Sequence, residues 1–371
     1  MTRASTRPAA QAGESLPPAP RPELEGLPVY EPGRAAARGA VKLASNENPY
    51  GPSPRVLRAL RSIKDIERYP DGSCLRLRSA LSKSLRVPED HLLIGAGSDE
   101  IGDLIGRAYL RPRDAVVYPK YSFIRYAMIA RMSGALPVET RVRADFSIDV
   151  ADLVRVIRFT RPRVVFLANP NNPTGAYLAR PALRDILRAI PPSTLFALDE
   201  AYFEYASLSA DYPDGIAHLP ACRNLVVLRT FSKIHALAGL RVGFAAAHPS
   251  IIAELHKVRP PFNVNSVAQI AAIAAIRDRS HVRSAARSNA REREKLRSAL
   301  GELGYRVFQS AGNFLMMDAG MAGRDFFSIL ARRGLILRTL HPYGLPNFIR
   351  ITTGTPGENR RLLRAIRAIP R

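Results

Sequence analysis

The sequence of 371 residues contains no tryptophan, two cysteines and no long apolar run. Two cysteines, Cys74 and Cys222, do not make a disulfide framework in a chain of this length, so we expect a reducing, cytoplasmic environment. The longest apolar runs, such as VVFLA and LIGAG, are far too short to cross a bilayer. These absences argue against a disulfide-stapled secreted domain and predict that no membrane is a partner.

Lysine is also scarce, with seven lysines among the 55 basic residues. Arginine stays protonated and cannot act as an amine nucleophile, whereas burial can deprotonate a lysine. Lys233 lies in an otherwise largely apolar stretch, RTFSKIHALAGLRVGF, which spans Arg229 to Phe244. A lysine kept in such a setting, by a chain that otherwise uses arginine, indicates a chemical role.

The net charge of +23 raises the possibility of a nucleic-acid partner. The arginines are scattered along the whole chain, and the sequence has no zinc-finger spacing, no RNA-binding aromatic signature and no basic heptad region. We therefore expect a solvated, arginine-rich surface without a nucleic-acid partner. Its positive field would favour anionic substrates.

The N-terminal segment, residues 1–26, is dominated by proline, alanine and arginine and has no apolar signal core. We interpret it as a disordered tail, and a transit peptide is the alternative.

Short apolar segments then alternate with helical ones, which predicts an α/β fold with a mostly parallel sheet sandwiched by helices. The strand-like segments include DAVVYP, RVVFLANP, TLFALDE and NLVVLRT. From about Val258 the pattern changes to a long helical stretch followed by the strand-like segments NFLMMDA, GLILRTL and FIRITTG. We therefore expect a large domain at 45–262 and a smaller α+β domain at 263–371.

Four loops at predicted strand ends carry chemically useful residues, and ligands of open α/β sheets bind at these ends. They are GAGSDE at 95–100, ANPNNPTG at 168–175, the segment around Asp199, and the segment around Lys233. Each alone has an ordinary explanation as a capped or stiff turn. Together, a phosphate cradle, a buried carboxylate and a lysine fit the requirements of pyridoxal 5'-phosphate, PLP.

From Leu27 to its C-terminus the chain resembles the fold-type I PLP-dependent aminotransferases of class I/II, and more narrowly the histidinol-phosphate aminotransferase family. The resemblance rests on motifs that occur in the same order, namely SNENPYGPSP, GAGSDE, ANPNNPTG, DEAYFEY, TFSKIHALAGLRVGF, RPPFNVNSVAQ and YGLPNFIRITTGT. It implies a large PLP-binding domain and a small domain on which residues 27–44 pack. It also implies a homodimer with shared active sites.

The resemblance also implies residue roles. Lys233 would form the Schiff base with PLP and move the proton, Asp199 would pair with the pyridine nitrogen, and Tyr202 would hydrogen-bond the phenolic oxygen. The implied cofactor-binding residues are Ser98, Asp99, Tyr121, Asn169, Asp199, Tyr202, Ser232, Lys233, Arg241 and, from the neighbouring subunit, Tyr50. The implied substrate-binding residues are Tyr30, Asn169, Arg338 and Arg350.

One segment departs from the family pattern. His341 and Pro342 stand where small apolar residues are expected, and this loop would border the substrate. We interpret His235 and His341 as structural residues. Asn263 and Asn265 have two interpretations, as pocket residues or as a helix-entry turn.

The expected reaction is a two-step transamination between a small-molecule amino donor and a 2-oxo acid, most specifically histidinol phosphate and 2-oxoglutarate in histidine biosynthesis. Three alternatives stay open from the sequence. They are an aromatic amino-acid aminotransferase, a threonine-phosphate decarboxylase and a basic nucleic-acid-binding protein on a degenerate enzyme fold.

Overall fold

The structure is a computed structural model that describes residues 21–24, 27, 39–64 and 66–369. Tyr30 and most of the predicted tail therefore lie outside the described residues. Within that tail, Pro22–Leu24 forms a 3-10 turn, beside which Arg21 Nη2 donates a hydrogen bond to the carbonyl oxygen of Met132 at 3.0 Å.

The large lobe is built on a seven-stranded sheet in the order β2-β8-β7-β6-β5-β3-β4. Neighbouring strands from β7 to β4 are parallel, and β8 is antiparallel to both of its neighbours. The strands are β2 (Leu92–Gly95), β3 (Ala115–Pro119), β4 (Leu136–Thr140), β5 (Val164–Ala168), β6 (Leu195–Asp199), β7 (Leu225–Thr230) and β8 (Gly243–Ala247). The predicted mostly parallel sheet is confirmed.

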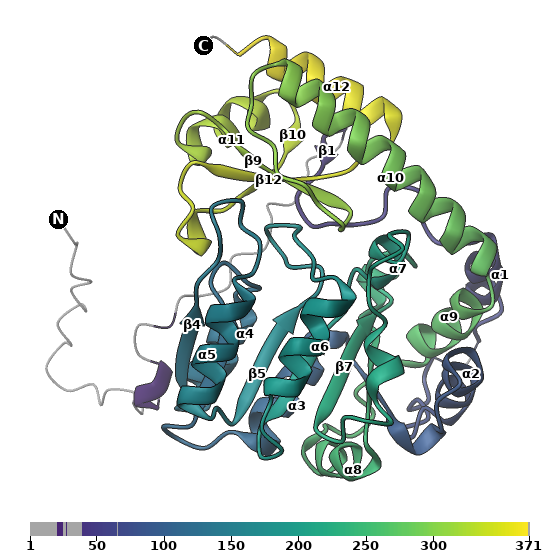
Figure 1. The fold of residues 1–371 in the computed structure, drawn as a ribbon. Coiled ribbons are helices and arrows are strands. Elements are labelled where there is room, and N and C mark those ends of the chain that lie inside the picture. Colours follow the sequence, from purple (N-terminus) through teal and green to yellow (C-terminus); the bar gives the residue numbers. More distant parts are fainter. Residues whose placement is uncertain (1–20, 25–26, 28–38, 65, 370–371) are drawn as a thin grey trace, which may run out of the picture.

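Helices cover both faces of this sheet, as Figure 1 shows. Because strand side chains alternate between faces, Phe166 of β5 packs into one core and Leu167 into the other. Helices α3 (Ser98–Tyr109), α4 (Arg125–Met132) and α8 (Pro249–Val258) contribute to the Phe166 core. The Leu167 core is formed with α2 (Leu75–Leu85), α5 (Val150–Thr160), α6 (Arg180–Ala189) and α9 (Ser266–Ile276).

The small lobe contains an antiparallel sheet in the order β11-β12-β9. Its strands are β9 (Phe314–Asp318), β11 (Arg338–Thr339) and β12 (Phe348–Thr352), and its helices are α10 (Arg279–Glu302), α11 (Gly323–Arg332) and α12 (Pro356–Arg367). A short strand from near the N-terminus, β1 (Val41–Lys42), pairs in parallel with β10 (Leu335–Ile336). Residues 41–43 thereby join the small lobe, and Leu43 lies in its core.

Helix α9 packs with the large lobe, against α2 and α1 (Pro54–Arg61), and Ala268, Ala271 and Ala272 lie in the large core. In Figure 1, α10 then runs from beside α9 and α1 up to the small lobe. The residues of α9, which the sequence-based expectation assigned to the small domain, thus pack with the large lobe. None of the helices in the described part of the chain has both the length and the apolarity that a bilayer span needs.

Candidate active site

A cavity of about 380 Å³ lies at the carboxyl ends of β5, β6 and β7, where the small lobe and the segment after β1 meet the large lobe. Its walls come from residues that are far apart in the sequence. They are Ala44, Ser45, Asn46, Ser98, Asp99, Phe123, Arg125, Tyr126, Ala168, Pro170, Asn172, Asp199, Ala201, Tyr202, Thr230, Ser232, Lys233, Arg241, Arg338, Tyr343 and Arg350.

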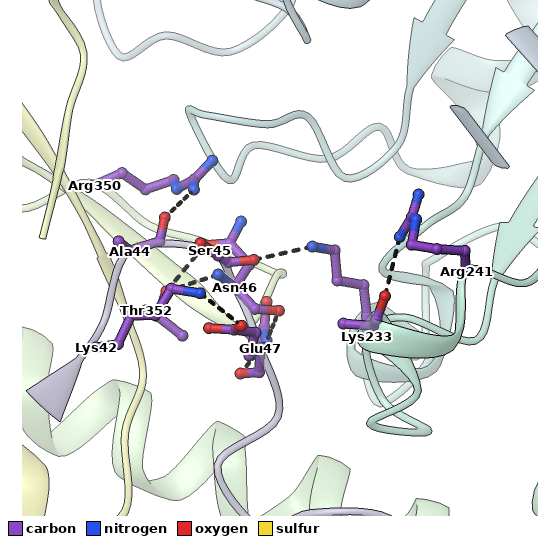
Figure 2. A network of polar contacts seen from close by, with 11 residues as sticks. Lys42, Ala44, Ser45, Asn46, Glu47, Lys233, Arg241, Arg350 and Thr352 are labelled. Atoms are coloured by element: carbon purple, nitrogen blue, oxygen red, sulfur yellow. Dashed lines mark hydrogen bonds and ion pairs between the residues drawn. The ribbon is translucent and has the colours of Figure 1, made fainter. Parts of the chain in front are cut away.

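Lys233 follows β7 and extends its amine into this cavity. Its Nζ donates a hydrogen bond to the carbonyl oxygen of Ser45 at 3.1 Å, as Figure 2 shows. Burial, with Arg350 and Arg241 nearby, lowers the pKa of Lys233 to about 7. Because the neutral amine is the nucleophilic form, Lys233 can bond a carbonyl carbon near neutral pH.

Asp199 ends β6 and lines the same cavity. Its Oδ2 accepts a hydrogen bond from the Tyr126 hydroxyl at 2.8 Å, and its Oδ1 accepts one from the Ala201 N–H at 3.0 Å. Burial raises the pKa of Asp199, although these hydrogen bonds and Lys233 favour its charged form. Both donors found among the described residues are uncharged, so the carboxylate is suited to a cationic ligand group such as a protonated ring nitrogen.

Tyr202 is buried at the cavity wall, with its ring edge-on to Phe314. Its hydroxyl oxygen accepts a hydrogen bond from Asn46 Nδ2 at 2.8 Å, and burial raises the pKa of Tyr202 to about 12. The hydroxyl therefore keeps its proton at neutral pH and can donate it in a hydrogen bond to a ligand oxygen.

The other end of the cavity is suited to an anion. Helix α3 begins at Ser98, and its N-cap Gly97, at φ +88°, makes no side-chain capping hydrogen bond. The first N–H groups of a helix lack intrahelical partners, and together with the helix dipole they favour a negative group at this position. Arg241 contributes a cation beside it, and its Nη1 lies 3.4 Å from Ser232 Oγ.

Gly243, the first residue of β8, allows this helix start to come close. A Cβ atom there would lie 2.5 Å from the backbone nitrogen of Ser98. We expect Gly243→Ala to lower the free energy of unfolding by about 1–3 kcal/mol and to weaken anion binding, because backbone must move. Gly239→Ala is the matched control, since a Cβ at Gly239 meets no atom within 4 Å. Equal unfolding midpoints for the two variants in a denaturant titration would contradict this prediction.

Two arginines of the small lobe line the opposite part of the cavity. Arg338 and Arg350 are direct cross-strand partners on β11 and β12. Arg350 donates to the carbonyl oxygen of Ala44 at 2.6 Å and to Asn172 Oδ1. For the side chain of Arg338 the described residues provide no hydrogen bond or ion pair. The pair can hold a second anionic group, at a distance from α3.

Two sequence-predicted residues are not where they were expected. Asn169 is fully buried, and its side chain exchanges hydrogen bonds with the backbone of Leu178, accepting at 2.8 Å and donating at 3.3 Å. It does not line the cavity, whereas Asn172 of the same ANPNNPTG loop does. The structure therefore does not bring Asn169 together with the other predicted residues, because a loop without regular periodicity gives no sign of which asparagine faces the cavity.

Tyr121 also lies apart from the other predicted residues. Its backbone has φ +57°, and its ring packs on Phe146 with the centroids 5.5 Å apart, outside the cavity. Phe123 lines the cavity in its place. Asn46, Arg125, Tyr126 and Tyr343 also line the cavity, and no sequence pattern assigned them to it. Asn46 stands in SNENPYGPSP, so the resemblance marked that segment without assigning the residue.

Tyr50 is 36% exposed and lies outside this cavity, so its predicted contact would have to be made in a second subunit. Tyr30 lies outside the described residues. His341 is exposed, with Nδ1 3.3 Å from Arg324 Nη2, and is not a cavity residue. Asn265 caps α9 through the Ala268 N–H at 2.7 Å, which supports the helix-entry interpretation of its segment.

The fold and this cavity are those of an aminotransferase. The chain belongs to the family Aminotransferase class I and II, which matches residues 38–366. It is 40% identical over 352 residues to the histidinol-phosphate aminotransferase of Moorella thermoacetica, covering 94% of this chain and 90% of that protein. A second relative, histidinol-phosphate aminotransferase 2 of Pseudomonas fluorescens, is 40% identical over 352 residues, covering 94% of each protein.

A solved structure of a histidinol-phosphate aminotransferase has a fold similar to that of this chain. The crystal structure of histidinol-phosphate aminotransferase from Sinorhizobium meliloti in complex with pyridoxal-5'-phosphate superimposes with a TM-score of 0.86 at 27% identity. The match covers 94% of this chain and 98% of that one.

Proposed function

We propose that this chain is a PLP-dependent aminotransferase that takes the amino group of histidinol phosphate and gives it to 2-oxoglutarate, reversibly. The observation that carries the proposal is that one cavity is lined by the Lys233 amine, by the buried Asp199 carboxylate, and by arginines at two separate places. The relatives and the solved structure support the same assignment.

When bound, PLP supplies an aldehyde that a lysine amine can bond and a ring that accepts the electron pair released at the substrate Cα. Lys233 Nζ would provide that amine and would move the proton to and from the substrate. The Asp199 carboxylate would hold positive charge on the ring nitrogen, and Tyr202 and Asn172 would hold the phenolic oxygen.

The cofactor's phosphate would lie at the start of α3, where the backbone N–H groups of Ser98 and Asp99 meet Ser232 and Arg241. At the other end Arg338 and Arg350 would bind the second anion, either the phosphate of histidinol phosphate or a carboxylate of glutamate. Guanidinium groups suit both because each can bind two oxygens at once. We keep Tyr30 as a proposed contact to the same substrate phosphate.

We further propose a cytoplasmic homodimer with shared active sites. Several large apolar side chains of the large lobe are exposed, namely Leu57, Ile66, Tyr69, Leu75 and Phe262. Tyr69 is 82% exposed and stacks on Phe262 with the ring centroids 4.7 Å apart. Exposed, stacked aromatic side chains such as this pair are common at protein interfaces. A second copy would also give Tyr50 the contact that a single chain does not offer.

The test is single-turnover absorbance spectroscopy of the purified holoenzyme with histidinol phosphate, phenylalanine, tyrosine and threonine phosphate. We expect histidinol phosphate to convert the bound cofactor to pyridoxamine phosphate fastest. Faster conversion by phenylalanine or tyrosine would move the function to aromatic transamination, and carbon dioxide release from threonine phosphate would move it to decarboxylation.

The substrate end is tested by Arg338→Gln in the same assay. We expect the concentration of histidinol phosphate at half-maximal rate to rise roughly 10- to 100-fold, because a charge-assisted contact to its phosphate is lost. Histidinol, which has neither the phosphate nor a carboxylate, serves as the control donor and should change less. An equal change for both donors would contradict a phosphate-specific role for Arg338.

A further inference from the structure

Arg125, which was not assigned a role by the sequence, lines the cavity from the first turn of α4. Its side chain is 14% exposed and is held by two carboxylates of α3. Arg125 Nε donates to Asp99 Oδ1 at 3.0 Å, and Nη2 donates to Asp103 Oδ1 at 2.5 Å. Both ends of the guanidinium fork are thereby directed at α3 rather than at the cavity.

The position of Arg125 in the first turn of α4 is unfavourable for that helix. A cation in the first turn of a helix opposes the helix dipole, and α4 has no side-chain cap to compensate for it. Burial alone would lower the pKa of Arg125, but Asp99 and Asp103 outweigh it and raise the pKa above its ordinary value. Asp99 and Asp103 thus stabilise the guanidinium at a position that the helix dipole disfavours, so the ion pair is placed for the site rather than for α4 itself.

The ion pair matters to the site because of the position of Asp99. It is the second residue of α3, it lines the cavity, and its side chain is 42% exposed. The N–H groups of this turn are suited to an anion, and an unpaired carboxylate beside them would repel it. Arg125 draws the Asp99 carboxylate into an ion pair on the side facing α4, which leaves the N–H groups to the ligand.

We propose that Arg125 is a positioning residue for the phosphate end of the cofactor, acting through Asp99. It pairs with and orients the Asp99 carboxylate, so that this carboxylate is directed away from the N–H groups at the start of α3. The inference rests on the proposed PLP function. It requires the effect of Arg125 to depend on Asp99 and on the phosphate of the ligand.

The experiment titrates cofactor-free protein with PLP and with pyridoxal, which lacks the phosphate, and reads the absorbance of the bound form. We expect Arg125→Gln to raise the dissociation constant of PLP roughly tenfold or more, because the Asp99 charge then faces the phosphate. The dissociation constant of pyridoxal should stay within about twofold of that of the unaltered protein. Arg131→Gln is the matched control, since it removes an exposed cation from the same helix.

Asp99 supplies the decisive variants. The Asp99→Asn variant should bind PLP at least as tightly as the unaltered protein. In the double variant, Arg125→Gln with Asp99→Asn, the dissociation constant of PLP should return to within about threefold of that of the unaltered protein. No recovery in the double variant would mean that Arg125 contacts the phosphate itself and would overturn the proposal. Equal weakening of PLP and pyridoxal would indicate a merely structural role and would also overturn it. If the unaltered protein bound neither compound, the proposed function would fail instead.

Discussion

Lys233→Ala is expected to reduce transamination by on the order of 10³-fold or more, because both the nucleophilic amine and the proton carrier are lost. The variant should still bind PLP through the remaining contacts, but without the absorbance of a lysine Schiff base. Lys257→Ala is the matched control, since Lys257 is an exposed lysine paired with Glu254 on α8. Turnover of the Lys233 variant near that of the control would remove the basis of the proposed mechanism.

The pH dependence of the reactivity of the Lys233 amine tests the same site without a measurement of catalysis. Its pKa is lowered to about 7, so below that pH the amine is protonated and above it the amine is neutral and reactive. In cofactor-free protein, acylation of Lys233 should rise steeply from about pH 6 to about pH 8, whereas an ordinary exposed lysine titrates near pH 10.4. Peptide mass spectrometry after brief labelling distinguishes Lys233 from the other lysines. An ordinary labelling profile for Lys233 would contradict its burial in the cavity.

Asp199→Asn is expected to lower turnover roughly 10²- to 10³-fold, because breaking a buried charge pair costs about 3–5 kcal/mol. The amide keeps the shape of the side chain and can still meet the Tyr126 hydroxyl, but it cannot hold positive charge on the ring nitrogen. The measurements are turnover and the absorbance spectrum of the bound cofactor, which should shift with the protonation of the ring.

Asp185→Asn is the control for this variant, since Asp185 is an exposed aspartate on α6 whose Oδ1 lies 3.9 Å from Arg188 Nη1. An Asp199→Asn enzyme with normal turnover and an unchanged spectrum would show that the carboxylate does not pair with the ring. The pKa of Asp199 is raised by burial, so its charge depends on a cationic partner. Loss of the cofactor from this variant at low concentration would be consistent with the proposed pairing.

The resemblance and the strand-end argument together identified most of the candidate site. Ser98, Asp99, Asp199, Tyr202, Ser232, Lys233, Arg241, Arg338 and Arg350 all line one cavity. For the large-lobe residues the physical reason is simple, because the ends of parallel strands meet at one edge of the sheet and carry their following loops with them. The apolar segments and the helices between them therefore determined both the fold class and the location of the chemistry.

The sequence could not decide side-chain directions in the loops. Asn169 and Asn172 stand three positions apart in one loop, and only the backbone path turns Asn169 toward Leu178 and Asn172 toward the cavity. Tyr121 and Phe123 differ for the same reason, since the left-handed backbone at Tyr121 directs its ring toward Phe146. Helices and strands have a period that predicts direction, and these loops have none.

Contacts between distant segments were also decided by the tertiary structure alone. The Tyr126 hydroxyl reaches Asp199, Asn46 reaches Tyr202, and Arg125 joins α4 to the start of α3. None of these pairs has a local signal, because a hydrogen bond between segments depends on how helices and strands pack. By itself the sequence determined the α/β architecture, the lysine and the strand-end residues. Packing decided which neighbours hold those residues in place and set the pKa of Lys233 and Asp199, because burial and nearby charges exist only in the folded chain.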